Sequence, residues 1–458
     1  MPAMLTPGIF KANDIRGVVG TDQPEWDADG ARALGVAFVE LADLAGESFV
    51  MGRDMRTSGP QLSAAFADGA ARAGASVIDI GLASTDQLWF ASGHLDRPGA
   101  QFTASHNPAR YNGIKFCRHQ AQPVTPGFLV ELAALAQRYD AEGLPDPVGG
   151  GQVSQQDLLG AYAGYLHSLV RLDHTRRLRV VVDAGNGMAG HTAPAVLGPL
   201  NVELVGLFLD LDGSFPNHQP NPLEPQNLVD AQRAVVEHQA DLALVFDGDA
   251  DRCFVIDERG QVVPPSIVTA LIAASELERE PGATVVVNTI TSRAAAEVVD
   301  EHGGTVVTSR VGHTYVKALM AEHGAVFGGE HSAHYYFRDF WGADTGMLAG
   351  LHVLGLLGRS DQPLSQLVAA YDRYVGSGEI NSSVADQQAA MRTVAEHFAG
   401  RGSIDWTDGL TVRADDWWVS LRASNTEPLL RLNVEACDQA TMEGLRDETL
   451  ALVRAEGR

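Results

Sequence analysis

The sequence predicts a multidomain α/β protein, in which three related α/β domains are followed by a C-terminal α+β domain. Its 458 residues are about three times the length of a typical domain, so two to four domains are expected. A unit of strand, turn, helix and second strand recurs three times along the chain, whereas the final part contains short alternating strands followed by one helix. These observations together predict the fold class.

The repeated unit begins with a short run rich in β-branched residues and bounded by small polar residues. In its first copy the strands are residues 48–52 and 76–81, separated by a stretch with helical periodicity. The second copy opens with the strand 178–183, and the third has strands at 283–287 and 304–308. Apolar runs of this kind, alternating with helices, are typical of parallel α/β layers. We therefore expect three related α/β domains.

The C-terminal part shows a different pattern from about Gly376 onward. Short alternating runs (LTVRA, WWVSLRA and LLRLNVEA) precede a predicted helix over residues 440–454, which is the order expected of an α+β domain. Gly, Pro and polar residues cluster at three places that we interpret as linkers, namely 143–152, 257–265 and 375–379. The predicted domains are residues 1–154, 155–256, 257–374 and 375–458.

The composition indicates a globular protein with an acidic surface. The chain is 45% hydrophobic and 20% charged, which are ordinary values for a protein with a real core. Its formal net charge is −25, and this charge would repel phosphate backbones over most of the surface. Generic nucleic-acid binders and anionic-membrane binders are therefore excluded. An anionic substrate would require a local cluster of basic residues.

The cysteines and the N-terminal segment indicate the cellular setting. Cys117, Cys253 and Cys437 are odd in number and far apart, so neither a disulfide framework nor a cysteine-rich zinc site is expected. The first residues lack the basic start and apolar run of a signal peptide, and no stretch approaches about 18 consecutive apolar residues. We expect a cytoplasmic protein, monomeric or dimeric, with neither nucleic-acid nor membrane partners.

The first candidate site is the segment TASHNP, residues 103–108. A lone serine before an Asn-Pro turn is most often a cap or turn residue. The side chains of Ser105 and the adjacent His106 are expected to diverge, which argues against a protease-type Ser–His pair. Lys115, a few residues further on, is able to neutralise a phosphate. The segment therefore favours phosphate chemistry over acyl chemistry.

The second candidate site is DGDADR, residues 247–252, directly after the apolar strand LALVF. Asp247, Asp249 and Asp251 alternate along the chain, and such carboxylates suit a hard cation such as Mg²⁺. Without a cation, their clustering after a buried strand is electrostatically costly. A strand that ends in Asp-x-Asp is also typical of haloacid-dehalogenase-type phosphotransferases, in which the first Asp is the nucleophile, and this alternative stays open.

The third candidate site is GGEHSAHYYF, residues 328–337. Glu330, Ser332 and His334 alternate, so an extended chain would direct all three toward one side. Sugars require fixed donors and acceptors of this kind. A polar edge strand is the alternative interpretation.

The fourth candidate site is RASNTEP, residues 422–428, with Arg431 shortly after it. Small polar residues between Arg422 and Arg431 are suited to bind a phosphate through backbone N–H groups, hydroxyls and guanidinium groups. A strand-to-strand turn with solvated arginines is the alternative.

Taken together, the four segments resemble the α-D-phosphohexomutase superfamily, in its bacterial phosphomannomutase/phosphoglucomutase branch. The motifs follow the family's order with one in each predicted domain, and the resemblance covers essentially the whole chain. It implies a heart-shaped four-domain enzyme whose central cleft is lined by one loop from each domain. Further matches are NDIRG (13–17), GRDMRTS (52–58), DAGNG (183–187), PNPLEPQNL (220–228) and VGHTYVK (311–317).

The resemblance also implies a role for each motif. Ser105 would be the phosphoserine, with His106 and Lys115 beside it and with Arg16 and His313 in the same cleft. The ligands of Mg²⁺ would be Asp247, Asp249, Asp251 and an oxygen of the phosphorylated Ser105. Arg252 would contact the phosphate or the sugar. Glu330 and Ser332 would bind the 3- and 4-hydroxyls of the sugar, with His334 alongside. The non-transferring phosphate would be bound by Arg422, Ser424, Asn425 and Thr426, with Arg431 nearby.

The implied activity is the interconversion of hexose 1-phosphate and hexose 6-phosphate, with mannose and also glucose as the expected sugars. It would proceed through a phosphoserine enzyme and a hexose 1,6-bisphosphate, which also serves as activator. The alternatives are a phosphoglucosamine mutase or a phosphoglucomutase of the same superfamily. More remote alternatives are an aspartyl-phosphate phosphotransferase and a non-catalytic sugar-phosphate sensor.

Two positions depart from the family pattern. Asn13 stands where the family often has tyrosine, and Ile290 stands where some close relatives have lysine. The general acid and base are therefore open, and the candidates are His106, His313, His334 and Lys115.

Overall fold

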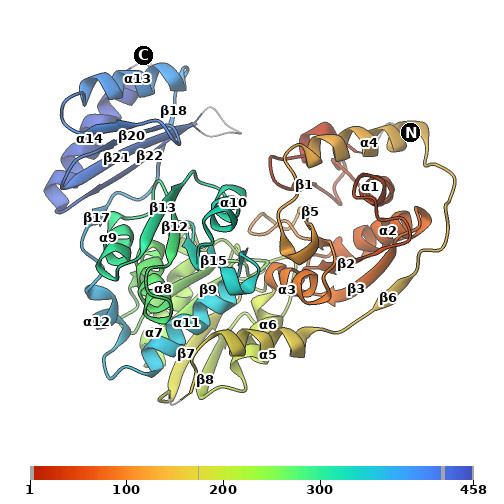
Figure 1. Cartoon of the computed structure of the whole chain (residues 1–458), viewed down its shortest axis with the longest axis horizontal. Helices are drawn as coiled ribbons and strands as arrows, with labels where there is room; N and C mark the ends of the chain where they lie inside the picture. The colour runs from red at the N-terminus through yellow and green to blue at the C-terminus, as the bar shows by residue number, and fades with distance from the viewer. Residues whose placement is uncertain (1–4, 174, 424–428, 456–458) are drawn as a thin grey trace. The chain divides into compact units, whose positions relative to one another are not determined.

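The computed structural model describes residues 5–173, 175–423 and 429–455 (Figure 1). The chain divides into two compact units. The first unit contains the chain up to Val263 together with Ser332–Ser365, and the second contains Pro264–His331 and the chain from Gln366 onward. Among the described helices, none is both long enough and apolar enough to cross a membrane.

The N-terminal sheet of the first unit carries the serine motif. Parallel pairs join β2 to β3 and β4, and β3 to β6, whereas β5 runs antiparallel to both β1 and β4. Helices α1, α2 and α4 bury an aromatic-rich core against the sheet. The strands are β1 (Ile15–Val18), β2 (Ser48–Arg53), β3 (Ser76–Leu82), β4 (Gly99–Phe102), β5 (Tyr111–Cys117) and β6 (Val153–Gln155), and the helices are α1 (Ala28–Leu41), α2 (Gly59–Arg72), α3 (Thr85–Leu95) and α4 (Phe128–Glu142).

The second sheet of this unit carries the aspartate motif. Its central strand β7 runs parallel to β8 and β9, and β10 and β11 extend the sheet in antiparallel fashion beyond β9. The elements are α5 (Leu159–Leu169), β7 (Leu178–Asp183), α6 (Ala189–Leu197), β8 (Val202–Leu207), α7 (Val229–Glu237), β9 (Leu242–Phe246), β10 (Cys253–Asp257) and β11 (Val262–Val263). The unit also holds β15 (Tyr335–Phe337), β16 (Ala343–Asp344) and α11 (Gly346–Gly358).

The second unit contains a parallel layer and an antiparallel sheet. In the parallel layer, β12 pairs with β13 and β14. Its elements are α8 (Pro265–Arg279), β12 (Thr284–Asn288), α9 (Arg293–Glu301), β13 (Thr305–Ser309), α10 (His313–His323) and β14 (Phe327–Gly329). Helix α12 (Leu364–Ala369) begins in the first unit and ends in the second. The antiparallel sheet is ordered β17-β22-β21-β20-β19, with β18 also paired to β22. Its elements are β17 (Val375–Gly376), β18 (Ile380–Ser383), α13 (Gln387–His397), β19 (Ser403–Asp405), β20 (Leu410–Arg413), β21 (Trp417–Ala423), β22 (Leu429–Ala436) and α14 (Gln439–Ala455).

The fold class predicted from the sequence is confirmed, because three α/β domains precede a C-terminal domain with an antiparallel sheet. Each predicted strand of the repeated unit is observed within one or two residues, and the predicted C-terminal helix is α14. The boundaries of the four domains stay predictions.

A buried carboxylate connects three separate segments of the first unit. Asp86, in the first turn of α3, accepts hydrogen bonds from Tyr162 on α5 and from Thr345 at the start of α11, both at 2.7 Å. Ser84, which caps α3, donates a third hydrogen bond to the same carboxylate. Burial raises the pKa of Asp86 to about 6, and the negative charge of Asp251 adds a smaller effect in the same direction. The three hydroxyl donors lower this pKa but do not outweigh burial.

We expect Asp86→Asn to flatten the dependence of stability on pH. Because the folded protein holds the proton of Asp86 more tightly than the unfolded chain does, the wild type should lose stability as pH rises from about 4 to about 6. The loss attributable to this group is about 3 kcal/mol, and the variant should not show it. Urea unfolding at pH 4.5, 5.5 and 7 measures this, with the exposed Asp22→Asn as control. Parallel curves for wild type and Asp86→Asn would refute the assignment.

Candidate active site

Ser105 lies in the loop between β4 and β5 in a left-handed backbone conformation, with φ of 48°. Its backbone N–H donates to Thr103 Oγ1 at 2.9 Å. Its side chain is buried, and Oγ lies 3.0 Å from Asp247 Oδ2 and 3.2 Å from His106 Nδ1. The expectation that Ser105 and His106 would diverge is therefore wrong. It assumed an ordinary backbone, whereas the positive φ turns the neighbouring side chains toward each other.

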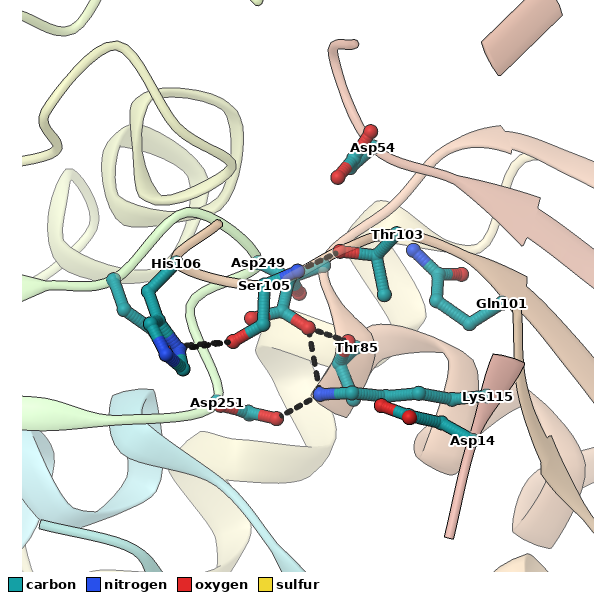
Figure 2. A network of polar contacts seen from close by, with 12 residues as sticks. Asp14, Asp54, Thr85, Gln101, Thr103, Ser105, His106, Lys115, Asp249 and Asp251 are labelled. Carbon is teal, nitrogen blue, oxygen red and sulfur yellow. Dashed lines mark hydrogen bonds and ion pairs between the residues drawn. The ribbon is translucent and has the colours of Figure 1, made fainter. Parts of the chain in front are cut away.

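The aspartate motif follows β9, a strand whose five residues are all buried. The carboxylates of Asp247, Asp249 and Asp251 are at most 1% exposed, and one oxygen from each lies within 4.8 Å of the others. Lys115 Nζ, from β5, donates to Asp249 Oδ2 at 2.7 Å and to Asp251 Oδ2 at 2.5 Å. Thr85 Oγ1 donates to Asp249 Oδ2 at 2.6 Å. Figure 2 shows Lys115 and Thr85 converging on this carboxylate from the first domain.

Burial and mutual repulsion perturb the ionisation of this cluster. Burial, and then the charges of Asp251 and Asp249, raise the pKa of Asp247 well above its usual value. Burial acts in the same direction on Asp251, but Lys115 and His334 outweigh it and hold the pKa of Asp251 well below the ordinary range. The two carboxylates raise the pKa of Lys115 although burial opposes this. The carboxylates of the cluster therefore favour the charged form of Lys115.

The oxygens in this cluster fit a hard divalent cation. Oδ1 of Asp249 and Oδ1 of Asp251 are buried and accept no hydrogen bond, which is costly for a carboxylate unless a cation is bound. Oxygen-only ligands are those that Mg²⁺ prefers. A second group that brings ligand atoms equally close is Asp251, His334 and Asp344, but its imidazole nitrogen makes it less suited to Mg²⁺.

The serine loop and the aspartate loop are in direct contact at Gly248. A Cβ atom at this position would lie 2.5 Å from the carbonyl oxygen of Ser105. On the opposite side, Met188 N–H donates to the carbonyl of Gly248 at 2.9 Å, and a Cβ at Gly187 would lie 2.7 Å from that carbonyl. Only glycine at position 248 allows the two loops to approach this closely.

Arg252 and His334 lie beside the three carboxylates. The backbone N–H of Arg252 donates to Asp247 Oδ1 at 3.2 Å, and Nε of the same residue lies 3.6 Å from Asp247 Oδ2. Arg252 Nε also donates to His334 Nε2 at 3.2 Å. His334 Nδ1 lies 3.1 Å from Ser332 Oγ, and His334 Nε2 also lies 3.6 Å from Asp251 Oδ1. Ser332, His334 and Arg252 are thus brought together beside the aspartate motif.

Arg16, on β1, supports the serine loop from its other side. Its Nη1 donates to Asn107 Oδ1 at 2.7 Å, and its Nη2 pairs with Asp14 at 2.5 Å. Burial, followed by the positive charges of Arg252 and Arg16, holds the pKa of His106 well below its usual value. His106 is therefore a neutral imidazole at neutral pH.

In the second unit, Glu330 directly follows β14 and is 2% exposed. Its Oε2 accepts hydrogen bonds from Asn288 Nδ2 at 3.1 Å and from the backbone N–H of Gly312 at 3.2 Å. His313, the first residue of α10, follows Gly312 directly. Glu330 and the start of α10 are therefore held together, whereas Ile290, at the departure from the family pattern, is buried and apolar.

Arg422 and Arg431 face each other on the paired strands β21 and β22. Glu379 lies 3.3 Å from Arg422 Nη2 and 3.6 Å from Arg431 Nη1, and Asp408 lies 3.8 Å from Arg422 Nη1. The Nε groups of both arginines are buried, and none of the residues that the structure describes accepts a hydrogen bond from them. The remaining predicted members of this motif, Ser424, Asn425 and Thr426, lie outside the described residues.

Sequence reasoning missed several polar residues of the first unit that fix this arrangement. Thr85 and Thr103 hydrogen-bond to the aspartate and serine motifs, and Arg56 donates to the serine loop from within GRDMRTS. That heptapeptide was used only as a match to the family. The sequence shows only an arginine within this polar segment. Its burial and its contacts with the serine loop depend on the tertiary fold.

Comparison with known proteins places the chain in one family. Models of phosphoglucomutase/phosphomannomutase domains I, II and III and of the C-terminal domain match residues 7–142, 161–260, 264–374 and 379–452. The chain belongs to the phosphoglucomutase/phosphomannomutase family.

Individual relatives match over nearly their full length. A phosphomannomutase of Salmonella montevideo is 39% identical over 460 residues, covering 97% of this chain and 99% of the relative. A protein of Xanthomonas campestris pv. campestris named phosphohexose mutases is 39% identical over 456 residues, covering 98% and 100%. The crystal structure of a phosphoglucomutase/phosphomannomutase family protein from Burkholderia thailandensis has a TM-score of 0.89 at 35% identity, covering 99% and 98%.

We expect Gly248→Ala to destabilise the protein by about 1–3 kcal/mol, as for other overpacked sites. The added methyl group would meet the Ser105 carbonyl and separate the two loops. Gly164→Ala is a matched control, because Gly164 lies within α5 and a Cβ there would meet nothing within 4 Å. The control should be neutral or stabilising by up to about 1 kcal/mol. Equal midpoints of urea unfolding for Gly248→Ala and wild type would contradict the contact.

Proposed function

We propose that this protein is a phosphohexomutase that interconverts hexose 1-phosphate and hexose 6-phosphate, with mannose as the physiological sugar and glucose also accepted. The observation that carries the proposal is the position of Ser105 Oγ, 3.0 Å from a cluster of three buried carboxylates with Lys115 beside them. The names of full-length relatives, phosphomannomutase and phosphohexose mutases, support the same activity.

The reaction begins from an enzyme phosphorylated on Ser105. The free hydroxyl of the sugar phosphate attacks phosphorus and loses its proton to a base, while the bond from phosphorus to Ser105 Oγ breaks and the released serine oxygen takes up a proton. The resulting hexose 1,6-bisphosphate turns around in the site. Ser105 Oγ then attacks the other phosphate and loses its proton, while the sugar oxygen released takes up a proton. Positioning carries most of the catalysis in such transfers.

The residues of the aspartate motif would hold Mg²⁺, together with an oxygen of the phosphorylated serine. When bound, the ion offsets negative charge on the transferring phosphoryl group. Lys115 supplies a fixed positive charge for the same purpose, since Asp249 and Asp251 keep it protonated. His106 Nδ1 lies 3.2 Å from Ser105 Oγ and stays a candidate for the base of the return step. In that role the serine hydroxyl would turn toward the imidazole from Asp247 Oδ2, its acceptor in this structure.

Arg252, Arg16 and Arg422 are proposed to offset the phosphate charges, with Arg431 nearby. They supply the local positive field that a chain of net charge −25 needs to bind an anionic substrate. Asp247 is the alternative covalent nucleophile, and its two carboxylate oxygens accept hydrogen bonds from Arg252 N–H and from Ser105.

We expect Ser105→Ala to lose most mutase turnover and to lose the single phosphate that intact-mass analysis should show on the wild type. The serine lies in a loop, and its hydroxyl serves transfer rather than packing. The exposed Ser154→Ala on β6 is the control and should retain both properties. A coupled assay with mannose 1-phosphate, Mg²⁺ and a trace of bisphosphate measures turnover.

Two outcomes would overturn the assignment of the phosphoserine. The first is near wild-type turnover in Ser105→Ala. The second is a phosphoenzyme that hydroxylamine cleaves, because an acyl phosphate on Asp247 is labile to that reagent and a phosphoserine is not.

The proposed sugar contacts predict the substrate range. Glu330, whose Oε2 is fixed by two hydrogen bonds, and Ser332 are proposed to bind O3 and O4, which are equatorial in both mannose and glucose. Kcat/KM for the two 1-phosphates should therefore agree within about a hundredfold. Galactose 1-phosphate, inverted at C4, should be much poorer because it leaves a buried polar group unpaired. Comparable turnover of galactose 1-phosphate would show that these residues do not read the sugar as proposed.

A further inference from the structure

Arg56 is a fully buried arginine, with 0% of its side chain exposed, that the proposed reaction does not use. It follows β2 by three residues. A buried guanidinium carries five N–H donors and a positive charge, and each of these must be satisfied within the protein. The partners of these donors define what the residue does.

All five donors of Arg56 are satisfied, and four of them hold a single loop. Nη2 donates to the carbonyls of Ser105 and Asn107, each at 2.7 Å. Nη1 donates to the carbonyls of Pro108 and Tyr111, at 2.9 and 3.0 Å.

The fifth donor, Nε, bonds Asp54 Oδ2 at 3.1 Å, which also balances the charge. The backbone N–H of Arg56 donates to the other oxygen of Asp54 at 2.9 Å. The planar fork of a guanidinium can make this set of bonds, whereas the ammonium of lysine has only three donors.

The loop that Arg56 holds is the one whose backbone is strained. Ser105 has a φ of 48°, a conformation that is unfavourable for a residue with a side chain and persists only when the surroundings enforce it. The bond from Nη2 fixes the carbonyl that follows this φ. Rotating Ser105 to an ordinary conformation would move that carbonyl away from Arg56. The same rotation would move Oγ away from the aspartate motif.

The second domain covers Arg56 from outside. The ring of Phe215 lies 5.2 Å from the guanidinium carbon. A Cβ at Gly213 would lie 2.7 Å from the Cα of Arg56, so backbone packs directly against this residue. Arg56 is therefore enclosed between the serine loop and the domain that carries the aspartate motif.

We propose that Arg56 is a positioning residue, which clamps the carbonyls of Ser105, Asn107, Pro108 and Tyr111 so that Ser105 Oγ faces the aspartate motif. Arg56 touches neither substrate nor the reacting atoms. The inference rests on the proposed function, because it assigns Arg56 to the transfer step at Ser105. It predicts that weakening the clamp slows transfer while the affinity for sugar phosphate is kept.

The test is Arg56→Lys in the full-length enzyme, which keeps the charge and removes the fork. We expect kcat to fall on the order of 10- to 100-fold, as for a small misplacement of a reacting group, with KM within about twofold of wild type. Asp54→Asn removes the negative charge that anchors Arg56 through its Nε and its backbone N–H, and it leaves the four bonds from Nη1 and Nη2 to the loop. It should also lower kcat with KM unchanged, but by a smaller factor. Arg53→Lys, three residues upstream and half-buried, is the control and should behave as wild type.

The crystal structures of the variants give a readout that does not depend on turnover. In Arg56→Lys, φ of Ser105 should leave the left-handed region, or the distance from Oγ to Asp247 should exceed hydrogen-bond range. If Arg56→Lys does not fold, Asp54→Asn decides the question by the same two measurements. Wild-type kcat together with an unmoved Ser105 in the folded variant would overturn the proposal. An inactive wild type would instead overturn the proposed function, and the crystal structures would then test the clamp alone.

Discussion

Three carboxylates buried at the end of one apolar strand are the constraint on which the first unit depends. Asp247, Asp249 and Asp251 are almost fully removed from water, and their mutual repulsion is expensive in a medium of low dielectric constant. Lys115 bonds directly to two of them, and Arg252 Nε lies 3.6 Å from the third, Asp247. Among the described residues, Oδ1 of Asp249 and Oδ1 of Asp251 accept no hydrogen bond, and the three carboxylates form a candidate cation site.

The neighbouring segments of the first unit are arranged around these three carboxylates. Lys115 and Thr85 come from the first domain and reach across to the aspartate motif, so the electrostatic compensation also joins two domains. Gly248 allows the serine loop to approach, and Arg56 fixes the strained backbone of that loop. The result places a serine hydroxyl, a candidate cation site and an imidazole within a few ångströms. Each group is ordinary alone, and their proximity is what supports the proposed phosphoryl transfer.

Much of this could be predicted from the sequence, because the relevant patterns are local. Short apolar runs predicted β2, β7 and β12 closely, and the spacing of the aspartates indicated a cation site. The contacts of Arg56 and Thr85 could not be predicted, since they join residues that are 49 to 164 positions apart. The approach of His106 to Ser105 was predicted wrongly, because it depends on a single positive φ that the surrounding fold imposes.

The most direct test of this account is anomalous scattering from crystals soaked in Mn²⁺, a hard cation with preferences close to those of Mg²⁺. The account predicts one strong peak at roughly 2.0–2.4 Å from carboxylate oxygens of Asp247, Asp249 and Asp251. A peak bound by Asp251, His334 and Asp344 without Asp247 and Asp249, or no peak at either group, would contradict it.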